Sequence, residues 1–234
     1  MFELTIFKNQ YDNKTHKRVS LPTWDKFVEL LYGLSNQEGA KGGRDSSPLI
    51  TPAVFEDGTT RSNKSTLYWG NWCAVDVDDH DFSSNLEILK GELYERFGHL
   101  AYVVYSTASN GLSKAKFRVV FRLDQKVEQD RIKAFWYALN TELGEIGDPQ
   151  TKDLARMYFV PARYPNSHPF IFHNDGDSIN VDELIAKHPF VKAWQQHRGQ
   201  IHRQLPAADK DHQRRDDIRR QRHGCVEGVG HVFQ

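Results

Sequence analysis

The segment from Trp72 to Asp81 constrains the fold most, because an apolar run leads directly into a group of carboxylates. Residues 72–75 read as a strand that leaves a protein core, and Asp76 and Asp78 alternate with Val77. On a strand, residues i and i+2 point to the same face, so both carboxylates are expected to project together. Mg²⁺ or Mn²⁺ would offset the cost of burying them unpaired. The segment therefore predicts a metal site, or else a solvated turn whose acids cap the next helix.

The remaining patterns predict interleaved strands and helices. Expected strands cover residues 2–7, 48–55, 67–77, 101–105, 116–123, 156–161 and 170–173. Expected helices cover residues 24–34 with Thr23 as N-cap, 86–97 with Ser83 or Ser84 as cap, 128–143, and 181–194 with an interruption near Pro189. This order indicates an α/β or α+β class, with a mixed central sheet flanked by helices.

Composition limits the class of protein. With 38% hydrophobic and 26% charged residues the chain is expected to fold, as residues 1–200 with a charged, flexible tail at 201–234. The formal net charge is zero, so a nucleic-acid surface would need local segregation of charge. Cys73 and Cys225 form neither a disulfide framework nor a zinc site. No signal peptide or membrane span is visible, which predicts a cytoplasmic protein without membrane contact.

A loop of small hydroxyl residues follows the expected strand at 101–105. Residues 106–111 are Ser-Thr-Ala-Ser-Asn-Gly, which allow backbone N–H groups to approach a phosphate. Lys116 and Arg118 follow on one face of the next strand and could neutralise a triphosphate. The alternative is a hairpin turn with two surface cations.

A third segment, residues 147–161, holds Asp148 and Asp153 and then Arg156 at the start of an apolar strand. Its alternative interpretation is an Asp-Pro turn and a helix cap, with Arg156 in an ordinary salt bridge. Basic residues also precede the first carboxylates. They are Lys41, Arg44, Arg61 and Lys64.

Taken in order, these segments resemble the archaeo-eukaryotic primase superfamily. The likeness is greatest to the small primase and primase-polymerase domains of phages, viruses and plasmids, and it covers residues 2–172. The first motif matches Asp76-Val77-Asp78, the second residues 106–110, and the third Asp148 or, as the alternative, Asp153. The family's second motif usually ends in a His that contacts nucleotide phosphates, and this chain has Asn110 there.

The resemblance implies a primase-like fold with an RRM-like catalytic module and template-dependent nucleotidyl transfer in DNA replication. Asp76, Asp78 and Asp148 would be catalytic and hold two Mg²⁺ or Mn²⁺ ions. Nucleoside triphosphate would contact Ser109, Asn110, Lys116 and Arg118, and Arg156 would contact it or orient Asp148. Single-stranded DNA template would follow Lys41, Arg44, Arg61 and Lys64. Trp69 or Tyr68 would stack on bases, or else both belong to the core. A replicative helicase is a further expected partner, and the cytoplasm of a phage or plasmid host the expected location.

Two other classes of function stay open from the sequence. One is a non-catalytic primase-like module that binds nucleic acid, which Asn110 favours. The other is a metal-dependent nuclease that uses Asp76, Asp78 and Asp148. No G-x-x-x-x-G-K-[ST] loop occurs, so no helicase is expected within this chain.

Overall fold

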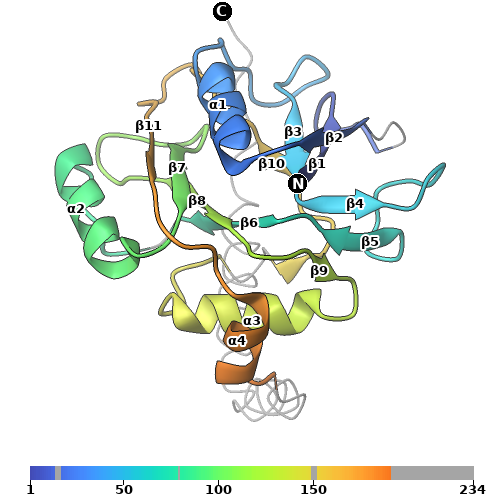
Figure 1. Cartoon of the computed structure of the whole chain (residues 1–234). Helices are drawn as coiled ribbons and strands as arrows, with labels where there is room; N and C mark the ends of the chain where they lie inside the picture. The colour runs from blue at the N-terminus through green and yellow to red at the C-terminus, as the bar shows by residue number, and fades with distance from the viewer. Residues whose placement is uncertain (14–16, 79, 149–151, 191–234) are drawn as a thin grey trace, which may run out of the picture. The chain divides into compact units, whose positions relative to one another are not determined.

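The centre of the fold is a four-stranded sheet in the order β11-β7-β8-β6. The computed structural model describes residues 1–13, 17–78, 80–148 and 152–190. β6 (Trp72–Val77), β7 (Tyr102–Ser106) and β8 (Phe117–Arg122) are buried along almost their whole length, and β11 (Ile171–Asn174) lies at one edge (Figure 1). Their nearly continuous apolar runs are typical of strands that are covered on both faces.

Each face of this sheet carries its own core. On one face, Val75, Val104 and Val119 pack with helices α2 (Leu86–Phe97), α3 (Ile132–Glu142) and α4 (Val181–Lys187). On the other face, Trp72 and Val103 pack with helix α1 (Trp24–Ser35). The alternation of strand residues between faces therefore sends Asp76 toward the α1 side.

The succession of elements around the central sheet is β6-α2-β7-β8-α3-β11, which is the β-α-β-β-α-β order of ferredoxin-like modules. The α+β class and the helix-flanked central sheet are thus confirmed. Every ladder between the described strands is antiparallel, and parallel pairing occurs only in isolated bridges such as Leu123 with Ile179.

Two smaller sheets lie beside the central one (Figure 1). The first has the order β10-β3-β1-β2, and the second the order β4-β5-β9. Their strands are β1 (Phe2–Phe7), β2 (Lys17–Leu21), β3 (Leu49–Thr51), β4 (Ala53–Phe55), β5 (Thr66–Trp69), β9 (Val127–Glu128) and β10 (Tyr158–Phe159).

Two strands expected to be continuous are divided between sheets. Pro52 separates β3 from β4, and Gly70 with Asn71 separates β5 from β6. Gly70 is required for a close approach, since a Cβ there would lie 2.4 Å from the carbonyl oxygen of Glu3. Its N–H donates to the carbonyl of Pro52, so both breaks meet at one corner of the fold.

The helix boundaries follow from their caps. Thr23 caps α1 as predicted, because its hydroxyl accepts from the N–H of Lys26. The predicted cap of α2 at Ser83 or Ser84 is wrong, since Asn85 accepts from the N–H groups of Glu87 and Ile88. β2 was not predicted, because this edge strand is short and only Val19 and Leu21 are apolar.

The expected boundary at residue 200 and the tail at 201–234 lie outside the described residues. Met1–Phe190 form one compact unit. None of the described helices is long and apolar enough to cross a membrane.

Candidate functional site

Asp76 and Arg118 form a buried ion pair at the end of the central sheet. They lie opposite each other in the β6-β8 ladder, and their exposed fractions are only 7% and 6%. Nε of Arg118 donates to Oδ1 of Asp76 over 2.6 Å, and Nη2 lies 2.6 Å from the same oxygen. Burying the Asp76 carboxylate without a partner would be costly, and the sequence suggested that a metal ion offsets this cost. In the structure Arg118, on the neighbouring strand β8, offsets it.

The rest of the Arg118 guanidinium is also engaged. Nη1 donates to the hydroxyl of Tyr105 and to the carbonyl of Phe159, each over 3.0 Å. The guanidinium carbon lies 4.4 Å from the centre of the Tyr158 ring. Burial acts to lower the pKa of Arg118, but the Asp76 carboxylate and the Tyr105 hydroxyl outweigh it and raise that pKa. The predicted role of Arg118 in binding triphosphate remains a prediction, and its described contacts all lie inside the protein.

Asp78 faces the same cavity as Asp76. This cavity has a volume of about 130 Å³, and carboxylates, cations and small hydroxyl residues line it. Asp78 follows the last residue of β6 and is only partly buried. Both carboxylates therefore line one cavity, in agreement with the prediction that they project together. Its lining residues are Lys41, Asp76, Asp78, Ser106, Thr107, Ala108, Ser109, Arg118, Phe159 and Val160.

Residues 106–109 of the hydroxyl-rich loop also line this cavity. Nζ of Lys41 donates to the hydroxyl of Ser109 over 3.0 Å, which brings a basic residue from the loop before β3 to the cavity. The hydroxyl oxygen of Thr107 is buried and has no hydrogen-bond partner among the described residues. A buried hydroxyl without a partner is costly, so a polar ligand in this cavity would be stabilised by a hydrogen bond with Thr107.

Asn110 holds the shape of this loop. Its Nδ2 donates to the carbonyl of His168 over 2.6 Å, and its Oδ1 accepts from the N–H of Lys116 over 2.8 Å. Asn110 is 4% exposed and does not line the cavity. Lys116 lies just before β8 and likewise is not in the lining. Their predicted contacts with nucleotide stay predictions, while the structure shows a scaffolding role for the Asn110 amide.

The third motif reaches the first through the main chain. The N–H of Asp148 donates to the carbonyl of Asp76 over 3.0 Å. Gly147 makes this approach possible, because a Cβ there would lie 2.7 Å from both Val75 and Asn140. Asp153 instead accepts weakly from the N–H of Ala155 over 3.4 Å, in a local turn. The main chain of Asp148 therefore adjoins Asp76, and the assignment of the Asp148 carboxylate as the third ligand stays a prediction.

Arg156 lies at the margin of this group. Its Nη2 is 4.0 Å from Oδ2 of Asp76, and its side chain is 34% exposed. The oxygen of Asp76 that Arg118 leaves unoccupied thus faces a second, more accessible arginine.

The four predicted template contacts do not form one surface around the cavity. Lys41 joins it, whereas Arg44 and Lys64 are exposed elsewhere in their loops. Arg61 is partly buried and donates from Nη1 to the carbonyl of Ala155 over 3.1 Å. The assignment of these four residues to template binding remains a prediction.

Of the two aromatics expected to stack on bases, Trp69 is excluded. It is 2% exposed and donates its indole N–H to the carbonyl of Leu154. Tyr68 is partly accessible, but its hydroxyl donates to Glu3 and its ring lies 4.5 Å from Nζ of Lys126. A buried tryptophan of this kind supports the core and cannot contact a base.

The donor set suits a hard cation held by few protein ligands. No group of three or more His, Cys, Asp or Glu side chains among the described residues is placed to hold a metal ion. Mg²⁺, however, is usually bound by one or two carboxylates together with substrate phosphates and water. Asp76 and Asp78, which line one cavity with Lys41, fit that arrangement.

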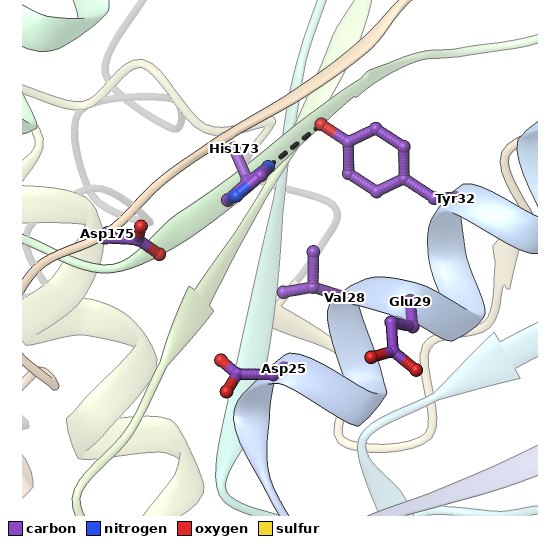
Figure 2. A pocket seen from close by; sticks show the side chains of 6 residues that line it. All are labelled: Asp25, Val28, Glu29, Tyr32, His173 and Asp175. Carbon is purple, nitrogen blue, oxygen red and sulfur yellow. Dashed lines mark hydrogen bonds between the residues drawn. The ribbon is translucent and has the colours of Figure 1, made fainter.

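A larger cavity has an acidic lining, whereas the lining of the smaller one contains both carboxylates and cations. It has a volume of about 520 Å³ and lies between α1 and β11 (Figure 2). Asp25, Glu29 and Asp175 surround a hydrogen bond of 2.9 Å between Tyr32 and His173. Lysine and arginine are absent from its described lining, so this cavity would repel a polyphosphate.

Sequence reasoning did not identify Tyr105, Tyr158 or the carbonyl of Phe159 as part of the site. Tyr105 and Tyr158 interrupt otherwise aliphatic runs, and buried tyrosines usually need a partner for the hydroxyl. That signal could have indicated a polar network on this face of the sheet, but not its partner.

No protein-family model matches the sequence, and no curated protein matches it. Among solved structures, the chain is similar to the AEP domain of the primase-polymerase (PrimPol) of cyanophage S-2L. The two are 13% identical with a TM-score of 0.43, and the match covers 80% of this chain and 88% of that one. A likeness at this level carries no argument about activity, so function rests on the residues of the site.

Proposed function

We propose that this chain is a DNA primase or primase-polymerase domain that transfers nucleotides onto a growing strand on a single-stranded DNA template. One observation carries the proposal. Asp76 and Asp78 share a cavity with Lys41 and with the unpartnered hydroxyl of Thr107. Carboxylates facing cations and hydroxyls in one small cavity suit a nucleoside triphosphate with its divalent cation.

The carboxylates would hold Mg²⁺ or Mn²⁺. Oδ2 of Asp76 and the carboxylate of Asp78 are the donors, and Asp148 is proposed as a third because its main chain adjoins Asp76. When bound, such a cation activates an attacking hydroxyl and stabilises the charge of the leaving pyrophosphate.

The other residues of the cavity would bind the triphosphate. Lys41 supplies a point charge, and the hydroxyls of Thr107 and Ser109 supply donors at neighbouring positions of one loop. The guanidinium of Arg156 lies near Asp76 and would bind a phosphate of the nucleotide in place of that carboxylate. The small side chains at 106–109 let the triphosphate approach the backbone.

Primer synthesis tests this proposal. Purified chain is incubated with single-stranded DNA, nucleoside triphosphates and Mn²⁺, and the products are resolved by length. Asp78→Asn should reduce product by about 100-fold or more, since a charged group of the reacting centre is removed. Asp81→Asn is the matched control, because Asp81 lies in the same acidic segment but is exposed and outside the cavity. Equal product from Asp78→Asn and wild type would overturn the assignment.

A non-catalytic binding module is the second candidate. It is favoured by the pairing of Asp76 with Arg118 and by the internal use of Asn110, the residue at the family's His position. Nucleotide binding without any product, beside an active control polymerase, would support it. Cleavage of single-stranded DNA without nucleotides would instead indicate a metal-dependent nuclease. A role in phage or plasmid replication and a helicase partner remain predictions.

A further inference from the structure

We propose that Arg118 is a positioning residue that fixes the Asp76 carboxylate and leaves only its Oδ2 oxygen available in the cavity. The inference deepens the proposed function and rests on it. It assigns to Arg118 a role other than direct contact with the triphosphate.

The first support is the geometry of the pair. Both Nε and Nη2 of Arg118 lie 2.6 Å from a single oxygen, Oδ1, and not one on each oxygen. Because the guanidinium is planar and donates two N–H groups to Oδ1, it restricts the position of that oxygen. Nη2 of Arg156 lies 4.0 Å from the second oxygen, Oδ2.

The second support is that Arg118 is itself held from several sides. Tyr105 on β7 and the carbonyl of Phe159 on β10 accept its Nη1 hydrogen bonds, and the ring of Tyr158 covers its face. Tyr158 in turn donates its hydroxyl to the carbonyl of Ala74 in β6, over 3.1 Å. The orientation of the Asp76 carboxylate is therefore determined by two strands besides its own and that of Arg118.

The third support is the cost of the alternative. For Arg118 to bind a phosphate it would have to leave Asp76, and a buried carboxylate without a partner is strongly unfavourable. Arg156 has no such constraint, because it is 34% exposed and its distance to Asp76 is long. Arg118 therefore holds the Asp76 carboxylate in place, and Arg156 is the arginine that can bind a phosphate.

The test uses two variants and a matched control, each in the full chain. Arg118→Lys keeps the charge but cannot place two donors on one oxygen or stack on Tyr158. Tyr105→Phe removes only the hydroxyl that accepts from Arg118, so it keeps the test valid if Arg118→Lys fails to fold. Arg122→Lys is the control, since Arg122 lies on the same strand and its side chain has no hydrogen bond or ion pair to a described residue.

Two quantities are measured on folded protein: Mn²⁺ affinity without nucleotide, by titration calorimetry, and kcat and KM of primer extension. We expect Arg118→Lys to weaken Mn²⁺ binding by about 10- to 100-fold and to lower kcat, with KM for nucleotide within about 2-fold. Tyr105→Phe should lower Mn²⁺ affinity and kcat by smaller factors, and Arg122→Lys should change neither Mn²⁺ affinity nor kcat.

The outcomes separate this inference from the proposed function. If wild type binds no Mn²⁺ and extends no primer, the proposed function fails, and the inference with it. If wild type does both and Arg118→Lys matches it in Mn²⁺ affinity, only the inference fails. A selective rise in nucleotide KM in Arg118→Lys, with kcat unchanged, would also overturn the inference and make Arg118 a direct nucleotide contact.

Discussion

The N–H of Asp148 donates a hydrogen bond to the carbonyl oxygen of Asp76 over 3.0 Å, which joins the third acidic motif to the first. Because the contact is between main chains, it persists whatever the side chain at position 148. The neighbouring Gly147, which has no room for a Cβ against Val75, allows this approach. The two motifs are therefore joined by a contact between their main chains.

Replacement of Asp148 by Asn should reduce primer synthesis. The backbone contact survives, but a carboxylate beside the reacting centre is lost, so we expect a loss of about 100-fold. Asp153→Asn is the control and should retain activity within about 2-fold, because Asp153 only closes a local turn. If Asp153→Asn is the inactive variant, the third carboxylate has been assigned to the wrong residue.

Loss of the Asn110 side chain should destabilise the protein. Asn110→Ala leaves the carbonyl of His168 and the N–H of Lys116 without their partner, at a cost of about 1–3 kcal/mol. Urea unfolding measures this loss of unfolding free energy. Ser109→Ala, a change at an exposed neighbouring residue, is the control and should change the free energy of unfolding by less than about 0.5 kcal/mol. Unchanged stability of Asn110→Ala with a raised nucleotide KM would show instead that Asn110 contacts the nucleotide.

The local part of this architecture follows from the sequence. The apolar lead-in at 72–75 predicted a buried strand, and the i, i+2 spacing of Asp76 and Asp78 predicted that both face one cavity. The strand at residues 2–7 and the cap at Thr23 were equally local, and both were predicted correctly, although buried Thr5 and partly buried Ile6 break the expected alternation. Such features depend on a few neighbouring residues, which is why pattern reasoning finds them.

The partners of the site do not follow from the sequence. Arg118 meets Asp76 only because β6 and β8 pair in one particular register, and a shift of one residue would send the guanidinium to the other face. The break between β5 and β6 at Gly70 depends on a close approach to the main chain of Glu3, which is distant in the sequence. For this reason Arg118 was interpreted as a phosphate ligand, while the structure makes it the counter-ion of Asp76.

Replacement of Arg156 by Gln should weaken nucleotide binding. The variant removes the more accessible of the two arginines near Asp76, and loss of one charge-assisted contact should raise nucleotide KM by about 10-fold or more. Mn²⁺ affinity should not fall, since Arg156 opposes a cation at Oδ2. Arg163→Gln serves as control, because Arg163 is exposed and paired with Glu38. Equal KM values for the two variants would argue against a role of Arg156 at the triphosphate.

Stability should depend on the ionisation of Glu3 in mild acid. Burial acts to raise the pKa of Glu3, but hydrogen bonds from Arg18 and Tyr68 outweigh it and hold that pKa below its ordinary value of 4.5. The contribution of Glu3 is thus fully present above pH 4.5 and is lost as the pH falls through the folded pKa. The difference in unfolding free energy between wild type and Glu3→Gln should be at most about 1 kcal/mol at pH 7 and shrink toward pH 3. A difference that grows toward low pH would contradict this sign.

The central claim is that the cavity of Asp76 and Asp78 is the metal and nucleotide site. It is tested most directly by locating Mn²⁺ through anomalous diffraction, in crystals grown with Mn²⁺ and a non-hydrolysable nucleoside triphosphate. We predict a peak within about 2.2 Å of Oδ2 of Asp76 and of the Asp78 carboxylate, with the triphosphate toward Lys41 and Thr107. A peak only in the acidic cavity of Asp25, Glu29 and Asp175, or nucleotide bound without contact to Asp78, would contradict the claim.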